Sequence, residues 1–177
     1  MTDLTISPFT IIIDTREQLP YGFDSLKNGG KNLVVPIKFK GLPTGDYSIE
    51  GFEDTIAIER KSLEDLYSTL GHARERFERE FIRLNRLDCA VVAVEATLSE
   101  IYNPYSYSSD WRSKLAPLSV LGTIAAWKVR YSNVQWLFCG NRTLTELMIY
   151  QLLEKYYQQN HGPNETNRYQ GYNSGDA

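Results

Sequence analysis

Apolar and polar positions alternate along this chain in blocks that predict strands separated by helices. Residues 9–13, 89–94 and 134–138 are short apolar runs without helical spacing, so we predict them as strands, the first two of them buried. Residues 33–39 and 47–49 are predicted as two further strands, because turn-forming residues lie between them.

The most informative strand is predicted over residues 55–61, where polar and apolar side chains alternate. Arg60 shares one face of this strand with two isoleucines, whereas Glu59 and Lys61 lie on the opposite face. The turn that separates it from the preceding strand is short enough for a hairpin. Pairing of the two strands would bring Asp46 beside Glu59.

Four later segments show the spacing of amphipathic helices. The first begins after Ser62, which can cap it, and the others span residues 74–87, 115–131 and 143–159. In the last of them, the side chains expected to face the core are those of Leu144, Leu147, Met148 and Leu152. This order of strands and helices predicts an α/β layered fold with a mixed central sheet flanked by helices.

Length and composition are those of one globular domain. The chain has 177 residues, of which 42% are hydrophobic and 23% charged. We expect a domain over residues 1–159 and a disordered tail over residues 160–177, where apolar anchors are scarce. Cys89 and Cys139 are expected to be buried free thiols.

No apolar stretch approaches the ~18 residues of a membrane span, and the first residues lack the basic start of a signal peptide. The expectation is therefore an intracellular protein that makes no use of a membrane. Its location would be the cytoplasm or nucleoid, or the nucleus in a eukaryote.

The chemistry that stands out is the predicted pair of Asp46 and Glu59. Two adjacent carboxylates repel each other unless a cation joins them, and hard oxygen ligands suit Mg²⁺ or Mn²⁺. Lys61 beside them can position or activate a water and neutralise charge on a phosphate. The simpler alternative is a surface hairpin with a Glu59–Lys61 ion pair, which the E-x-K spacing alone does not exclude.

A longer sequence pattern favours a metal site over a surface hairpin. Gly45-Asp46-Tyr47, followed by Glu59-Arg60-Lys61 and, after three more residues, Asp65, resembles the signature of the XPF-type structure-specific DNA endonucleases. That family is a branch of the wider PD-(D/E)xK nuclease group. Upstream, Ile13-Asp14-Thr15-Arg16-Glu17 resembles its D-x-R-E segment, and the resemblance covers residues 9–95 by motif.

The resemblance implies a restriction-endonuclease-like layered fold. It also implies a divalent-metal-dependent endonuclease that hydrolyses phosphodiester bonds in branched, flap or fork DNA during repair or recombination. The metal, Mg²⁺ or Mn²⁺, would be held by Asp46, Glu59 and Asp14. The catalytic residues implied are Asp46, Glu59, Lys61, Asp14, Arg16, Glu17 and Arg60. Asp65 is either a further catalytic residue or only part of the helix cap.

Net charge argues against a broad DNA-binding surface. The formal net charge is -3, so DNA contacts must come from a local basic patch or from metal-bridged phosphates. The predicted helix over residues 74–87 carries arginines that can follow a phosphate backbone: Arg74, Arg76, Arg79 and Arg83, with Arg86 beyond them. The alternative is an ordinary solvated face, because acidic residues in residues 59–88 are as many as basic ones. The family carries a basic residue on this helix, for which Arg74 and Arg76 are both candidates.

Residues 99–114 combine tyrosines with Trp111, Arg112 and Lys114. Rings between basic residues can stack on unpaired bases, or they can pack on their own domain. Relatives in the family often carry tandem helix-hairpin-helix modules that bind DNA and build dimers. Here only a short tail follows, so we expect a stand-alone nuclease domain whose grip on DNA comes from a homodimer or a partner protein.

Two other function classes share parts of this pattern. An inactive nuclease fold that binds DNA or acts as a scaffold in recombination or repair should lack at least one of Asp14, Asp46, Glu59 and Lys61, and all are present. A nuclease of another type in the wider group is disfavoured by Arg60 and by residues 14–17.

Overall fold

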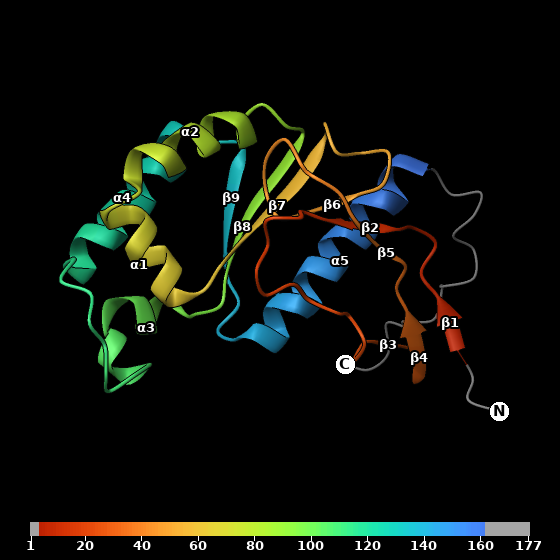
Figure 1. Cartoon of the computed structure of the whole chain (residues 1–177), viewed down its shortest axis with the longest axis horizontal. Helices are drawn as coiled ribbons and strands as arrows, with labels where there is room; N and C mark the ends of the chain where they lie inside the picture. The colour runs from red at the N-terminus through yellow and green to blue at the C-terminus, as the bar shows by residue number, and fades with distance from the viewer. Residues whose placement is uncertain (1–3, 162–177) are drawn as a thin grey trace, which may run out of the picture.

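The computed structural model describes residues 4–161, and within them six strands form a central sheet (Figure 1). The order across this sheet is β5 (Ile37–Phe39), β2 (Ile11–Ile13), β6 (Tyr47–Ile49), β7 (Ile56–Lys61), β8 (Cys89–Val94) and β9 (Val134–Phe138). Strand β6 runs antiparallel to both of its neighbours, and the other neighbouring pairs are parallel. The predicted α/β fold with a mixed sheet is confirmed.

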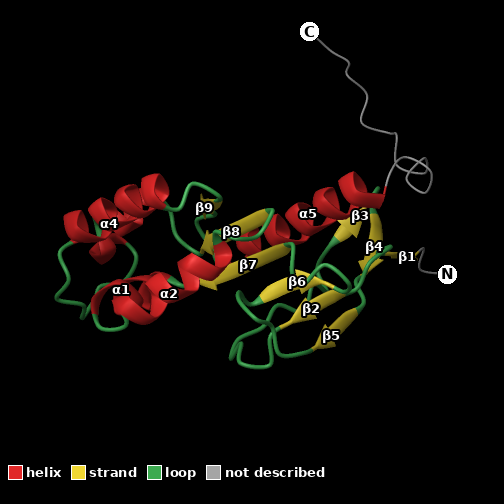
Figure 2. Cartoon of the chain, turned by 90° about the horizontal axis from the view of Figure 1, so that it is seen from above, coloured by secondary structure: helices red, strands yellow, loops and turns green. Residues whose placement is uncertain are grey.

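Helices cover both faces of the sheet (Figures 1 and 2). One hydrophobic cluster joins the sheet to α1 (Leu63–Gly71), α2 (Arg74–Leu84) and α4 (Pro117–Arg130). A second cluster joins the opposite face to α5 (Arg142–His161). The chain thus forms a sandwich of three layers, with the sheet in the middle.

Strand β7 is buried on both faces because helices cover each of them. Ala57 packs in the cluster under α1, α2 and α4, whereas Ile56 and Ile58 pack in the cluster under α5. Alternation along the strand therefore turns Glu59 toward the α1–α2 side and Arg60 toward the α5 side. The predicted separation of these two residues on opposite faces is confirmed.

The single strand predicted over residues 33–39 is wrong. The segment forms two strands in different sheets: β4 (Lys31–Val34), which pairs with β1 (Leu4–Ile6) and β3 (Lys27–Asn28), and β5, which pairs with β2. Pro36 lies between them and has no N–H for a ladder bond. Its carbonyl instead accepts the N–H of Ile11 at 2.9 Å.

The core face predicted for the last helix is wrong at three of its four residues, whereas the fourth, Leu152, is half-buried and packs against the core. The buried residues of α5 are Thr145, Ile149, Tyr150 and Leu153, whereas Leu144, Leu147 and Met148 are exposed. Thr145 can be buried because its hydroxyl donates to the carbonyl of Asn141 at 2.7 Å, and Tyr150 stacks on Phe9. The helix continues to His161, beyond the predicted boundary at residue 159, and the rest of the predicted tail lies outside the described residues.

The segment predicted as an aromatic loop, residues 99–114, begins with regular structure. It contains α3 (Leu98–Tyr102) and a short 3₁₀ helix, η1 (Pro104–Ser106). A capping box between Thr97 and Glu100 starts α3. Both cysteines are free, as predicted, but half-buried. No helix in residues 4–161 has the length and apolar character needed to cross a membrane.

Candidate active site

The hairpin of β6 and β7 places Asp46 next to Glu59. Tyr47 pairs with Ile58, and the N–H of Asp46 donates to the carbonyl of Ile58 at 2.9 Å. The Asp46 carboxylate in turn accepts the backbone N–H of Arg60 at 2.8 Å, which holds it against the end of β7. The hairpin and the pairing predicted from the sequence are therefore both present.

Gly45 makes this turn possible. Its φ of 74° lies in the left-handed region that favours glycine. A Cβ at this position would also come within 3.0 Å of the Ala57 Cβ and 3.2 Å of the Ile58 carbonyl oxygen. Glycine is the residue that lets the chain turn back closely enough for Asp46 to reach β7.

The two carboxylates affect each other's ionisation. Burial and the nearby charge of Glu59 raise the pKa of Asp46 well above its usual value. Burial also raises the pKa of Glu59, and this effect outweighs the opposing charge of Lys61. A bound cation would remove this penalty, because it replaces repulsion between the carboxylates with attraction to both.

Lys61 provides a fixed positive charge beside the pair. Its ammonium donates to the Glu59 carboxylate and lies 4.9 Å from the centre of the Phe77 ring. Burial lowers the pKa of Lys61, but the negative charges of Glu59 and Asp46 outweigh it and leave the pKa raised. The group is thus suited to neutralising negative charge and not to taking up a proton.

Sequence reasoning missed Glu80, a third carboxylate at this site. It projects from α2, accepts the Thr44 hydroxyl at 3.3 Å and the Gly45 N–H at 3.2 Å, and its charge raises the pKa of Glu59. The signal was present in the spacing, because Glu80 follows the buried Phe77 by three residues and so shares the inward face of α2.

Asp14 lies nearby, but its carboxylate has other partners. It accepts from the Arg16 side chain at 2.7 and 2.9 Å and from the Leu42 N–H at 2.6 Å. Burial raises the pKa of Asp14, yet these donors outweigh it and leave the pKa lowered, so the group stays charged. Its N–H donates to the Asp46 carbonyl at 2.8 Å, which ties the two segments together. A metal-binding role for Asp14 stays a prediction.

Arg16 is held by Asp14 while remaining open to solvent. Its guanidinium also donates to the Leu42 carbonyl at 2.8 Å, and 71% of its side chain is exposed. These bonds are made by Nε and Nη2, so the exposed guanidinium keeps the N–H groups of Nη1 for an anion such as a phosphate.

Arg60 occupies a different place from Lys61. Its guanidinium forms two hydrogen bonds with Glu95, at 2.9 and 2.8 Å, and lies 3.6 Å from Glu17. Arg142 lies 3.3 Å from the same Glu95 carboxylate. These groups form a buried ionic cluster on the α5 side of β7, and catalytic roles for Arg60 and Glu17 stay predictions. The sequence pattern predicts no role for Glu95.

The arginines of α2 are exposed but are not equivalent. Arg74 donates to the Thr123 hydroxyl at 2.8 Å and lies 5.4 Å from the Trp127 ring, so it joins α2 to α4. Arg83 lies 3.8 Å from Glu80. Within the described part of the chain, Arg76 and Arg79 form no ion pair.

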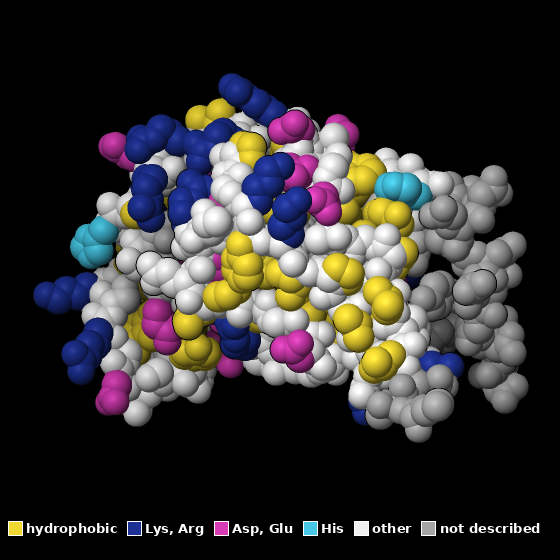
Figure 3. Space-filling model, turned by 45° about the vertical axis from the view of Figure 1, so that its right-hand side comes forward, with side chains coloured by type: hydrophobic (Ala, Val, Ile, Leu, Met, Phe, Trp, Pro, Cys, Tyr) yellow, Lys and Arg dark blue, Asp and Glu magenta, His cyan; other side chains and the backbone are white. Residues whose placement is uncertain are grey.

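Figure 3 shows a group of Lys and Arg side chains on one face with acidic side chains beside them, as expected for a local patch on an acidic protein.

Among residues 4–161, no three Asp, Glu, His or Cys side chains form a group that could hold a metal ion. The pair of Asp46 and Glu59 is nevertheless compatible with Mg²⁺, which is commonly held by one or two carboxylates while water and phosphate complete its shell. The mutual repulsion of the two groups is the observation that favours a cation between them.

Comparisons with known proteins agree with this geometry. The family model described as the ERCC4 domain matches residues 13–152. The fold is similar to XPF from Aeropyrum pernix, with a TM-score of 0.60 and 23% identity over 85% of this chain and 66% of that chain. It is also similar to XPF from Aeropyrum pernix in complex with DNA, with a TM-score of 0.58 and 21% identity over 90% and 69%. The chain spans about two thirds of these structures, and no curated protein matches it.

Proposed function

This chain belongs to the ERCC4-domain family of XPF-type DNA endonucleases, and on that premise we propose that it is a metal-dependent phosphodiester hydrolase acting on branched, flap or fork DNA. The observation that carries the proposal is the pair of mutually repelling carboxylates, Asp46 and Glu59, with the Lys61 ammonium beside them. Family membership alone would also fit a copy that has lost its activity.

In this proposal, Asp46 and Glu59 hold Mg²⁺ or Mn²⁺. When bound, such an ion polarises a phosphate and lowers the pKa of a coordinated water. A third ligand from Asp14 would require its carboxylate to leave Arg16 and Leu42. We therefore assign Asp14 the task of holding Arg16 in place.

The remaining chemistry is assigned to basic groups of the chain. Lys61 neutralises charge at the reacting phosphate because its raised pKa keeps it an ammonium. Arg16 binds a neighbouring phosphate with its exposed guanidinium. The turn at Gly45, fixed by Glu80, keeps Asp46 in register with β7, and this rigidity matters because small displacements of reacting groups lower rates strongly.

DNA contact is proposed along α2, where Arg76, Arg79 and Arg83 are exposed on the same helix as the inward-facing Phe77 and Glu80. A helix that places a carboxylate at the site and arginines at the surface can guide a phosphate backbone past the carboxylate pair of Asp46 and Glu59. The net charge of -3 limits the affinity of this patch, so a second copy or a partner protein would strengthen binding.

The test is a panel of labelled flap, fork, nicked and linear DNAs of equal length, incubated with Mg²⁺, with Mn²⁺ or with EDTA. We expect cutting near the branch point with Mg²⁺ or Mn²⁺, and no cutting in EDTA. Binding without cutting in either metal would instead support the inactive DNA-binding or scaffolding module. Equal cutting of linear and branched DNA would contradict the proposed substrate class.

A further inference from the structure

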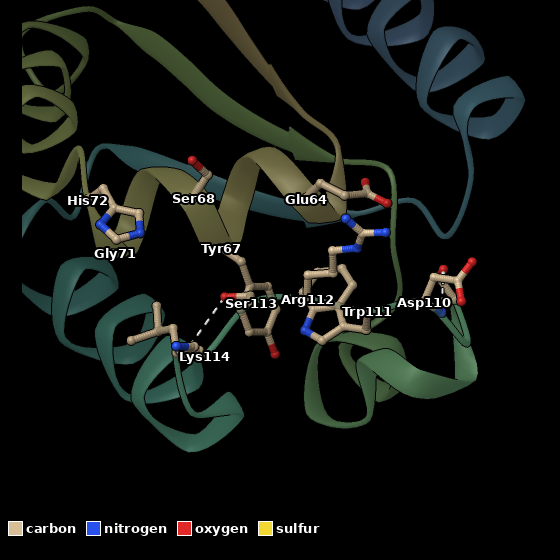
Figure 4. Close-up of a pocket in the computed structure, with 12 residues that line it drawn as sticks. Glu64, Tyr67, Ser68, Gly71, His72, Asp110, Trp111, Arg112, Ser113 and Lys114 are labelled. Atoms are coloured by element: carbon tan, nitrogen blue, oxygen red, sulfur yellow. Dashed lines mark hydrogen bonds between the residues drawn. The ribbon is translucent and has the colours of Figure 1, made fainter.

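A hollow of about 970 Å³ lies between α1 and residues 108–115, and we call it the α1 pocket (Figure 4). One face of α1 lines it, with residues at the helical spacings of three and four: Glu64, Tyr67, Ser68, Gly71 and His72. The volume is at the upper end of the range for pockets that bind small molecules. None of the groups proposed for hydrolysis lines it.

The pocket has an aromatic wall. The rings of Tyr67 and Trp111 are 4.7 Å apart and nearly perpendicular, at 77°. Tyr67 is buried and its hydroxyl donates to the carbonyl of Ile101, which fixes the pair. An edge-to-face contact covers at most one ring face, so the half-buried Trp111 keeps ring surface for a third aromatic group. Tyr105, by contrast, is 66% exposed and does not line the pocket.

Charged groups surround this wall. Arg112 and Lys114 follow Trp111 in the sequence, line the pocket and are both exposed. Figure 4 shows Arg112 beside Glu64 at one end. Glu64 and Asp110 add acceptors, which are the groups that bind the exocyclic amino groups of bases. The lining thus offers ring surface, cations for phosphates and acceptors for base edges.

The position of the pocket connects it to the proposed active site. Glu64 follows Lys61 by three residues, so their Cα atoms are at most about 11 Å apart, because consecutive Cα atoms are about 3.8 Å apart. A second hollow of about 400 Å³ adjoins the pocket at Gly71 and His72 and is lined by Arg76 and Arg79. A strand on the arginines of α2 can therefore continue past His72 into the α1 pocket.

We propose that the α1 pocket takes an unpaired nucleotide of the DNA next to the cleavage site, with its base against Trp111 and its phosphates near Arg112 and Lys114. This inference rests on the proposed function and adds to it the means by which a branch, which carries unpaired nucleotides, differs from plain duplex. A stacked base contributes between about 5- and 150-fold to the dissociation constant.

The experiment measures binding and leaves cutting aside. A fluorescently labelled single strand of eight deoxycytidines and a labelled 16-base-pair duplex are titrated with the full chain in EDTA, and anisotropy gives each Kd. Trp111→Ala should weaken binding of the single strand at least about fivefold and that of the duplex less than about twofold.

A second variant covers the case in which loss of the Trp111 ring unfolds the segment. Ser68 is exposed on α1 and lines the pocket, so Ser68→Phe fills the hollow without changing the core. It should weaken single-strand binding to a similar extent. Ser132 is exposed away from the pocket, and the matched Ser132→Phe variant should bind as wild type does.

The phosphate contacts are tested through salt. Replacing Arg112 and Lys114 with alanine should lower the slope of log affinity against log salt by about 1.4, since each lost contact to a single strand removes about 0.7. Lys128→Ala, at an exposed lysine on α4, should leave the slope unchanged.

Wild-type single-strand affinity in both Trp111→Ala and Ser68→Phe would overturn the inference, and would leave the pocket to a protein segment or another ligand. The proposed function fails in a different way. A chain that binds single strands through the pocket but cuts no DNA in Mg²⁺ would refute hydrolysis and leave the pocket assignment standing.

Discussion

The guanidinium of Arg60 and the carboxylate of Glu95 form two hydrogen bonds, at 2.9 and 2.8 Å, between the ends of β7 and β8. Both side chains are more than nine-tenths buried. The hydroxyl of Tyr21 donates to the same carboxylate, and Arg142 approaches it from α5. The Glu95 carboxylate therefore joins its own segment to three others, on the face of β7 opposite to Glu59 and Lys61.

Arg60→Ala should destabilise the fold by about 3–5 kcal/mol, because it leaves the buried Glu95 carboxylate without its main partner. For a chain of this length, that corresponds to a fall in Tm of roughly 10 °C, measured by calorimetry or circular dichroism. Lys38→Ala, at an exposed ion pair with Glu50, should have the same Tm as the wild type. Equal melting of Arg60→Ala and wild type would show that the cluster is not structural.

The same cluster predicts a dependence of stability on pH. Burial raises the pKa of Glu95, but hydrogen bonds from Arg60 and Tyr21 outweigh it, so the pKa in the folded state is lowered. A carboxyl of this kind contributes stability above its unfolded pKa of about 4.3, and loses it as the pH falls through the folded pKa. The Tm deficit of Glu95→Gln relative to wild type should therefore be largest near pH 7 and shrink below about pH 4. A deficit that is constant from pH 3 to pH 7 would contradict this assignment.

Lys61→Ala should lower the cutting rate by about 10²–10³-fold, the usual effect of removing one electrostatic contact in a site of this kind. The fold should change little in stability, because Glu59 can take up a proton when the ammonium is absent. The measurement is single-turnover cleavage of a flap substrate alongside a thermal melt. Normal cutting by this variant would mean that Glu59 and Lys61 form only a structural ion pair.

Arg79→Glu combined with Arg83→Glu should weaken binding of every DNA tested and reduce the salt slope for duplex by about 2, since each phosphate contact contributes about 0.9. The double variant Lys128→Glu with Lys27→Glu carries the same change in net charge at exposed positions away from the proposed contacts. An equal loss in both double variants would indicate a general charge effect. An unchanged salt slope in the Arg79→Glu, Arg83→Glu variant would show that the α2 arginines face solvent and do not contact DNA.

Local patterns, apolar runs for some strands and alternation for one, were sufficient for the strand that carries the chemistry and for two further strands of the same sheet. Strands β8 and β9 have the predicted bounds, and the alternation of residues 55–61 separates Glu59 from Arg60 as expected. The hairpin turn places Asp46 because the connection is short, and short connections leave few ways to pair. These features depend on residues that are close together in the sequence, so a local sequence pattern can predict them.

Contacts between distant segments were not predictable in this way. Helical spacing indicates that Glu80 faces inward, but not that it meets Gly45, which is 35 residues away. Glu95 likewise meets Arg60 across 35 residues, so neither pairing leaves a local pattern. In α5 the apolar residues of the first turns are exposed. The core instead contains the Tyr150 ring and Thr145, whose hydroxyl is hydrogen-bonded to the carbonyl of Asn141. Tertiary packing overrides the local preference at that helix.

In the proposed mechanism, Asp46 and Glu59 together hold the divalent ion required for DNA hydrolysis. Asp46→Asn keeps an oxygen that can accept the Arg60 N–H but removes one charge of the pair, so the fold should remain intact. The most direct measurement is single-turnover cleavage of a flap DNA in Mg²⁺ by wild type, Asp46→Asn and Glu53→Gln, with Glu53 serving as a carboxylate of the same hairpin outside the site. Wild type and Glu53→Gln should cut the flap, and a folded Asp46→Asn should show no detectable cutting. Full activity of Asp46→Asn, or of wild type in EDTA, would contradict this mechanism.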